Sequence, residues 1–325
     1  MGTDNEQSMS WKQYILCPIV LVSIQIFLIL LFIVNQNFRP SSEPLTNLHA
    51  HSNIILLGHF NYPSFNLSTW KESWSRVVNP DDIIIAVPNA QNKTPHFILQ
   101  DTQQILYKND RGYVSPYANI AKVIREREDI NGILYVHDDM LLSSSVLRKI
   151  GGTEWLATNV NAKKFAIYKN STSESIKDAP TWWVHWKGCI ATFLKMFNDS
   201  RLKPFKHKSV HQDSFINMKQ GQSDMLYAYL PREQKLAFLN LLELFSEYKL
   251  FLECAIPTSV LLMQEKFDIA LKSIPLCTFW NGLRGKPKEM IKKCGKDIVI
   301  HGAYHPIKIS FDHDWVQHFD DISST

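Results

Sequence analysis

The chain has 325 residues, of which 45% are hydrophobic and 20% are charged, and its formal net charge is +4. This is the composition of a globular protein with one sizeable core, and the chain has no internal repeat or low-complexity tract. The modest charge does not indicate a nucleic-acid binder, because the one dense basic stretch, Lys286–Lys296, is typical of a solvated helix face.

The first distinctive segment is an uncharged, almost wholly apolar run over residues 14–34. At about 1.5 Å of rise per residue, a helix of this length crosses a bilayer core of about 30 Å. No small-residue cleavage site follows, which favours an uncleaved signal anchor over a signal peptide. We therefore expect a cytosolic tail (residues 1–13), a transmembrane helix (14–34), a stem (35–51) and one folded domain (52–325).

Four N-x-S/T sequons follow the apolar run, beginning at Asn66, Asn92, Asn170 and Asn198. They are usable for N-glycosylation only if the carboxyl-terminal part of the chain is lumenal. The sequence thus predicts a single-pass type II membrane protein with an N-glycosylated lumenal body.

Four cysteines lie in this body: Cys189, Cys254, Cys277 and Cys294. They allow two disulfides in any of three pairings, and we favour Cys277–Cys294 because the two are close in sequence. The alternative for Cys254 is a buried, reduced cysteine that behaves as a small apolar residue. No CxxC pair occurs, which argues against a finger-type zinc site.

Strands and helices alternate along the first half of the body. Apolar runs bounded by turn residues predict strands, and Ser115-Pro116 opens an apolar periodic segment typical of a helix. The expected elements are strands at 53–58, 82–87 and 105–107, a helix at 115–127 and a strand at 132–136. This order predicts an α/β fold with a mixed, mostly parallel sheet flanked by helices.

The last of these strands leads directly into His137-Asp138-Asp139. Open α/β sheets bind their ligands at the carboxyl ends of the strands, and paired carboxylates there suit Mg²⁺ or Mn²⁺ with a bound phosphate. The alternative is a solvated turn after a buried strand. Arg111 follows the third strand. It is a candidate to bind a nucleotide or its phosphates, and the alternative is that it is an ordinary exposed arginine of a loop.

The middle of the chain carries three tryptophans, Trp182, Trp183 and Trp186. Their rings could stack on the apolar face of a sugar, and the simpler interpretation is that they belong to the hydrophobic core. Asp224 is a candidate to bind the hydroxyl of an acceptor substrate, and the alternative is that it caps a helix or strand. A helix is expected at 234–248. Glu253 lies in an apolar stretch, where a buried carboxylate has a raised pKa unless it is paired. It is therefore a candidate general base, with a salt bridge to a core arginine as the alternative.

A signal anchor, a stem, an α/β half and a strand that ends in paired aspartates together resemble the lumenal GT-A-fold glycosyltransferases. In that group a DxD motif holds a divalent metal on the diphosphate of a nucleotide sugar. The resemblance matches Asp139 to the metal carboxylate and Asp138 to the residue that contacts sugar or ribose, whereas His137 stands where a strict DxD has its first aspartate.

The resemblance extends to the end of the chain, where a strand expected at 297–300 runs into His301 and His305. In several GT-A families a late histidine completes the metal shell, and in the glycogenin-like family a lysine soon after it contacts the diphosphate. His305 or His301, with Lys308, is similar to that arrangement, and the choice between the histidines stays open. Imidazole is a suitable Mn²⁺ ligand and an ammonium group suits phosphate.

The resemblance implies a metal-dependent glycosyltransferase of the Golgi or endoplasmic reticulum membrane. It would use Mn²⁺ or Mg²⁺ and a nucleotide sugar, expected to be UDP-linked, and transfer the sugar to a hydroxyl of a glycan or glycoprotein. Two other readings remain open. One is a catalytically silent lumenal binding protein, which His137 supports, and the other is a metal-dependent hydrolase that uses the aspartates and histidines. A sulfotransferase is disfavoured, because no phosphate-binding loop follows the first strand.

Overall fold

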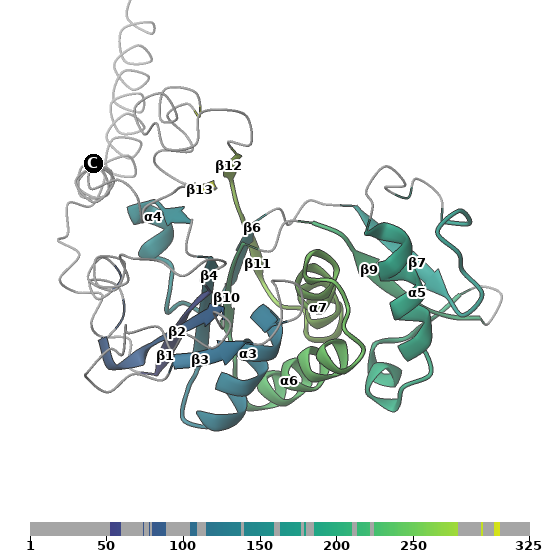
Figure 1. The fold of residues 1–325 in the computed structure, drawn as a ribbon, viewed down its shortest axis with the longest axis horizontal. Coiled ribbons are helices and arrows are strands. Elements are labelled where there is room, and N and C mark those ends of the chain that lie inside the picture. Colours follow the sequence, from purple (N-terminus) through teal and green to yellow (C-terminus); the bar gives the residue numbers. More distant parts are fainter. Residues whose placement is uncertain are drawn as a thin grey trace, which may run out of the picture. The chain divides into compact units, whose positions relative to one another are not determined.

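The structure is a computed structural model of the chain (Figure 1). All of the residues that it describes belong to one compact unit, Leu45–Thr325. They are residues 53–59, 74, 78, 80–88, 105–108, 115–137, 140–158, 163–176, 179, 185–209, 213–221, 224–278, 294 and 302–305.

A seven-stranded sheet forms the centre of this unit, with strand order β11-β6-β10-β4-β1-β2-β3 (Figure 1). Its strands are β1 (Ile54–His59), β2 (Ile83–Pro88), β3 (Ile105–Lys108), β4 (Gly132–His137), β6 (Trp155–Thr158), β10 (Met225–Tyr229) and β11 (Leu271–Ile274). Every residue of β4 is buried, as expected for a central strand that is covered on both faces.

β10 alone runs against the other six strands of this sheet, and it pairs antiparallel with both β4 and β6. Gly132 makes the close packing of β10 possible. A Cβ at Gly132 would lie 3.2 Å from the Cε2 and Oη atoms of Tyr227, so any larger residue would push the tyrosine ring away. Tyr227 instead stays buried and donates a hydrogen bond to the carbonyl oxygen of Gly152 at 2.9 Å.

Three long helices pack in series beside the sheet: α3 (Ser115–Glu126), α6 (Arg232–Glu247) and α7 (Leu252–Phe267). α3 contacts α6 and α6 contacts α7. Buried Tyr117 of α3 donates its hydroxyl to the carbonyl oxygens of Phe245 and Leu250, at the carboxyl end of α6. The Phe245 carbonyl oxygen also accepts from the N–H of Leu250 at 2.9 Å, so Tyr117 adds a second donor where the chain leaves α6. A short helix, α4 (Ser144–Leu147), and the 3-10 turn η2 (Pro80–Asp82) complete this part.

Residues 163–219 form a second body of structure, which we call the lysine-rich lobe. It holds the sheet β7-β9-β8, with β7 (Lys164–Tyr168), β8 (His207–Lys208) and β9 (Ser214–Lys219), together with α5 (Trp186–Met196) and the 3-10 helix η3 (Ser200–Phe205). Phe165 of β7 packs on Trp186 of α5 with ring centroids 4.9 Å apart. α7 packs against β9, and both α6 and α7 contact η3.

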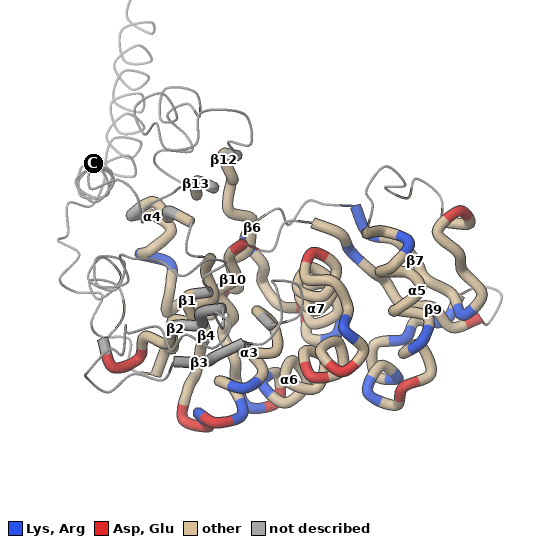
Figure 2. The backbone as a smooth tube through the Cα atoms, in the orientation of Figure 1, with Lys and Arg blue, Asp and Glu red and all other residues tan. Residues whose placement is uncertain are grey.

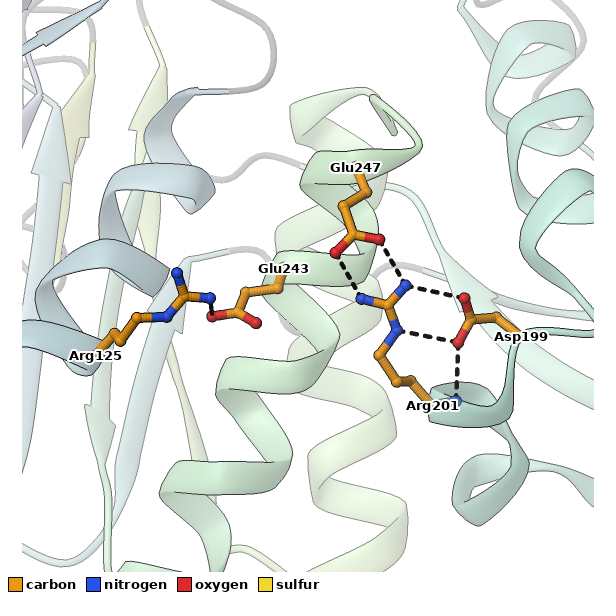
Figure 3. Close-up of polar contacts among 5 residues, drawn as sticks. All are labelled: Arg125, Asp199, Arg201, Glu243 and Glu247. Atoms are coloured by element: carbon orange, nitrogen blue, oxygen red, sulfur yellow. Dashed lines mark hydrogen bonds and ion pairs between the residues drawn. The ribbon is translucent and has the colours of Figure 1, made fainter.

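Charged side chains join these elements at the surface (Figure 3). Arg125 of α3 pairs with Glu243 of α6. Arg201 of η3 lies between Asp199, at 2.9 to 3.0 Å, and Glu247 of α6, at 2.6 to 2.7 Å. Hydrogen bonds from Arg201 lower the pKa of both carboxyl groups, so the guanidinium is held from two sides.

The elements expected from the sequence are confirmed within one or two residues at each end. They are the strands at 53–58, 82–87, 105–107 and 132–136 and the helices at 115–127 and 234–248. The disulfide Cys277–Cys294 is also confirmed, and the second pair is Cys189–Cys254. The alternative interpretation of Cys254 was a buried, reduced cysteine. Cys254 is buried, but it forms a disulfide. The mixed, mostly parallel sheet with flanking helices confirms the α/β class.

Within the described ranges, no helix is both long and apolar enough to span a membrane. The expected transmembrane helix, residues 14–34, and the strand expected at 297–300 lie outside these ranges.

We predict that Tyr117→Phe lowers the free energy of unfolding by about 1 to 3 kcal/mol, because the carbonyl oxygens of Phe245 and Leu250 lose the hydroxyl that donates to them, and Phe245 keeps only the N–H of Leu250. Urea unfolding of the purified protein measures the loss. Tyr168→Phe serves as the control, since Tyr168 is only partly buried. Equal stability of the two variants would show that the Tyr117 hydroxyl does not hold the end of α6.

Candidate functional site

The candidate residues of the first half of the chain follow, in the sequence, strands that end at the carboxyl edge of the central sheet. β1, β2, β3 and β4 are parallel neighbours and therefore end at this edge. β4 ends at His137, so Asp138 and Asp139 follow its last residue directly, although both lie outside the described residues. Arg111, three positions after β3, also lies outside them.

A small three-stranded sheet, β12-β13-β5, forms from segments that leave this same edge. β5 (Leu141–Leu142) starts two residues after Asp139, and β12 (Leu276–Thr278) follows β11 after Pro275. β13 (Ala303–His305) lies between them, parallel to β12 and antiparallel to β5. Backbone hydrogen bonds fix it, from Ser143 to Gly302 at 3.0 Å and from Ala303 to Pro275 at 2.8 Å.

The register of β13 sets the backbone of a late histidine opposite Met140. Ala303 pairs with Leu142 and Tyr304 with Leu141, so the next residue, His305, falls opposite Met140. Met140 is the residue immediately after Asp139. Two segments more than 160 residues apart in the sequence are thus neighbours in one sheet. His301 and Lys308, which flank β13, lie outside the described residues.

Asp224 lies at the same edge, because β10 runs in the opposite direction and begins where β4 ends. The backbone N–H of His137 donates to the carbonyl oxygen of Asp224 at 2.9 Å. Both side chains are buried, with 7% of His137 and 8% of Asp224 exposed. The ring of His137 meets the ring of Tyr135 edge-on, with centroids 5.5 Å apart. Asp224 therefore directly adjoins the His137-Asp138-Asp139 segment.

Glu253 is in the first turn of α7, and its backbone has an unusual partner. In a regular helix its carbonyl oxygen accepts from the N–H four residues later, but that residue is Pro257, which has no N–H. The carbonyl instead accepts from the N–H of Gly221 at 3.0 Å. The proline thus leaves an acceptor open on α7, and the segment that leads to Asp224 docks on it.

Thr258, the next residue of α7, docks the same strand. Its buried hydroxyl accepts from the N–H of Lys219 at 3.0 Å and donates to the Lys219 carbonyl oxygen at 3.1 Å. Farther along α7, Glu265 accepts from Asn217 at 2.7 Å. β9 is therefore hydrogen-bonded along the length of α7, which fixes the backbone at Lys219, and the Glu253 carbonyl fixes Gly221. Burial and the nearby charge of Lys164 lower the pKa of Lys219.

The start of α7 is also joined covalently to α5 through Cys189–Cys254. Beside this bond, the ring of His185 stacks on Phe251, with centroids 4.1 Å apart and planes at 11°. The amide N–H groups of Cys254 and Ala255 both donate to the carbonyl oxygen of Phe251. Glu253 thus stands on a helix start that is fixed from two sides.

The burial expected for Glu253 is wrong. Glu253 is only partly buried, because Cys254 and Ala255 occupy the inward face of this turn. Burial therefore supplies no argument for Glu253 as a general base. Of the three tryptophans, Trp186 is fully buried in the core as the simpler reading held, whereas Trp182 and Trp183 lie outside the described residues.

No group of three or more His, Cys, Asp or Glu side chains suited to a metal ion occurs among the described residues. The aspartates Asp138 and Asp139 and the side chain of His305 do not belong to that set. Sequence reasoning missed Pro257 and Thr258 as residues that position the site. The available signal was a proline within an apolar stretch that is otherwise compatible with a helix.

No family model matches the chain, and no curated protein sequence matches it. Among solved structures, the chain is similar to the galactosyltransferase LgtC, solved in complex with donor and acceptor sugar analogues. The identity is 10%, the TM-score is 0.32, and the alignment covers 83% of this chain and 94% of LgtC. At these values the likeness supports no conclusion about fold or activity.

We predict that Thr258→Val loosens the segment before Asp224, because two hydrogen bonds to the Lys219 backbone are lost with little change in side-chain volume. Hydrogen exchange at the Gly221 amide should become at least about tenfold faster, which corresponds to about 1.4 kcal/mol.

Ser259→Ala is the matched control. It also removes a buried hydroxyl, but one that bonds only within α7, to the carbonyl oxygen of Ile256. If both variants change Gly221 exchange equally, Thr258 does not position this segment.

Proposed function

We propose that the protein is a glycosyltransferase that moves a sugar from a nucleotide-sugar donor to a hydroxyl of a glycan or glycoprotein, with a divalent cation at the His137-Asp138-Asp139 motif. The observation that supports the proposal is the register of β13, whose continuation sets His305 opposite Met140, the residue after Asp139 in the sequence. Asp224 at the same edge adds a further carboxylate. Carboxylates with an imidazole at the carboxyl edge of an α/β sheet form a ligand set suited to Mn²⁺ or Mg²⁺ with a nucleotide.

In this proposal Asp139 and His305 hold the cation, with His301 as the alternative histidine, and Asp138 contacts the sugar or ribose of the donor. The cation, when bound, would stabilise the negative charge that grows on the diphosphate as it leaves. Lys308, three residues after β13, and Arg111, after β3, would add positive charge for the phosphates. A UDP-linked donor is the expected one.

Glu253 and Asp224 are the candidates on the acceptor side. Glu253 occupies the first turn of α7, where the partial positive charge of the helix end stabilises a carboxylate. Its partial exposure leaves it accessible to an acceptor hydroxyl, from which it would take the proton. Asp224 would orient that hydroxyl. The hydrogen bond from the N–H of Gly221 to the carbonyl oxygen of Glu253 holds the segment before Asp224 to the helix turn that carries Glu253.

We further propose that the enzyme is a type II protein of the Golgi or endoplasmic reticulum membrane, with a signal anchor at residues 14–34. Two disulfides favour an oxidising compartment such as the secretory lumen. Asn170 and Asn198, the two sequon asparagines within the described residues, are both exposed.

A catalytically silent protein of the same fold is the second candidate, and His137 favours it. This residue stands at the first position of the motif, and its side chain is buried against Tyr135. His137 therefore does not take the place of the metal-binding carboxylate that a strict DxD motif has at this position. A metal-dependent hydrolase is the third candidate, and it differs in releasing free sugar without an acceptor.

The test is a thermal-shift screen of the full chain in detergent against nucleotide sugars, with and without Mn²⁺. A donor at about 100 times its dissociation constant should stabilise the protein by about 2.7 kcal/mol. We expect this shift to require Mn²⁺ and to vanish in Asp139→Ala, but to persist in Asp213→Ala, which removes an exposed aspartate of the lysine-rich lobe. No shift with any donor would favour the silent protein, and release of free sugar without an acceptor would favour the hydrolase.

For the lumenal orientation we predict that Asn170→Gln and Asn198→Gln each reduce the apparent mass by one N-glycan, because both side chains are accessible to the glycosylation machinery. Electrophoresis after expression in a eukaryotic cell, with and without glycosidase, measures the change. Asn131→Gln is the control, since Asn131 is exposed but lies in no sequon. An unchanged mass in both sequon variants, with no response to glycosidase, would contradict the lumenal orientation.

A further inference from the structure

Positive charge is concentrated in the lysine-rich lobe. Residues 163–219 contain eleven Lys and Arg against four Asp and Glu, a formal charge of +7. The whole chain has 35 Lys and Arg against 31 Asp and Glu, a charge of +4, so the remainder of the chain carries −3. The basic balance of the protein therefore comes from this lobe alone, where Figure 2 shows Lys and Arg on several elements.

The carboxylates near the lobe are already engaged by some of its cations. Lys187 pairs with Glu174, Lys164 with Glu265, and Arg201 with both Asp199 and Glu247. Among the described residues, five further lysines of the lobe form no ion pair. They are Lys169, Lys195, Lys203, Lys206 and Lys208, which we call the lysine face.

These five lysines come from segments that meet near the carboxyl end of α5. Lys195 is in the last turn of α5, Lys203 is in η3, and Lys208 is in β8. Lys206, the residue after η3, places its Nζ 4.3 Å from the ring centroid of Phe197, which ends α5. Lys169 follows β7 and is close enough for its charge to lower the pKa of Lys206, after the larger effect of burial.

The positive charges of Lys169 and Lys206 repel each other, and a bound anion reduces this repulsion. The cations stand on separate segments, so a ligand with several negative groups along its length can reach more of them than one small ion can. Four of the five are exposed, and only Lys206 is partly buried.

We propose that the lysine face binds an acidic polysaccharide, that is, a glycan chain carrying repeated sulfate or carboxylate groups. The two disulfides and the exposed sequons favour a lumenal or extracellular lobe. In such a compartment nucleic acids are not the prevailing polyanions, and the strongly anionic membrane leaflet is the cytoplasmic one.

The lysine face is separate from the candidate site at the sheet edge. α5 begins at Trp186, beside the Cys189–Cys254 bond and α7, and the lysine face lies at its other end. Eleven helical residues span about 16 Å. The binding surface therefore goes beyond the proposed transfer reaction, and its test requires no transferase activity.

The test measures binding of the full chain in detergent to heparin, used as the probe, at salt concentrations from about 0.05 to about 0.2 M. Glycans at Asn170 and Asn198 are first trimmed enzymatically so that they do not cover the lobe. We expect salt-sensitive binding to heparin and none to neutral dextran. Lys203→Glu/Lys208→Glu, two exposed positions, should weaken it at least about tenfold, and so should Lys169→Glu/Lys206→Glu.

The matched control is Lys122→Glu/Arg232→Glu, which changes the net charge equally at exposed positions of α3 and α6. It should weaken binding less than about threefold, and melting temperatures confirm that all variants are folded. Equal losses in the control and in both lobe variants would overturn the proposal, as would an absence of heparin binding. Binding to vesicles of anionic phospholipid without binding to heparin would also overturn it, since it would assign the face to a membrane surface.

Discussion

The carbonyl oxygen of Glu253 is the point on which the arrangement of the candidate site depends. Pro257 cannot supply the helical N–H for this oxygen, and the N–H of Gly221 takes its place at 3.0 Å. The backbone just after β9 is therefore held on α7 at Gly221, three positions before Asp224 in the sequence. From there β10 runs back along β4, and the bond from His137 to Asp224 closes the connection between the helix and the motif strand.

The same connection explains why residues from distant parts of the sequence meet at one edge. Because β10 is antiparallel to β4, its first residue lies where β4 ends. Because β5 leaves that edge immediately after the motif, β13 can pair with it and bring His305 alongside. The disulfide Cys189–Cys254 then holds the start of α7, and with it Glu253, to α5. Each contact uses the backbone or a buried group, so the framework does not rely on surface ion pairs.

Much of the central sheet could be predicted from the sequence, because β1, β2 and β4 are continuous apolar runs and buried parallel strands have that composition. The end of β4 at His137, directly before Asp138 and Asp139 in the sequence, followed from the same pattern. α7 could not be predicted with confidence from its residues, since Pro257 interrupts the helical pattern and its apolar residues surround most of the helix. The burial assigned to Glu253 failed because its apolar neighbours in the sequence do not show which face of the element it occupies, and in α7 the inward face belongs to Cys254 and Ala255. The pairing of β13 with β5 is a long-range contact that no local pattern encodes.

The most direct test of the account is a double-mutant cycle for Mn²⁺ affinity with Asp139→Ala, His305→Ala and the double variant, measured by electron paramagnetic resonance. If both side chains hold one cation, their effects are strongly non-additive, with a coupling energy of about 1 kcal/mol or more. Additive effects within about 0.5 kcal/mol would show that the two residues act independently and would contradict a shared metal site at this edge.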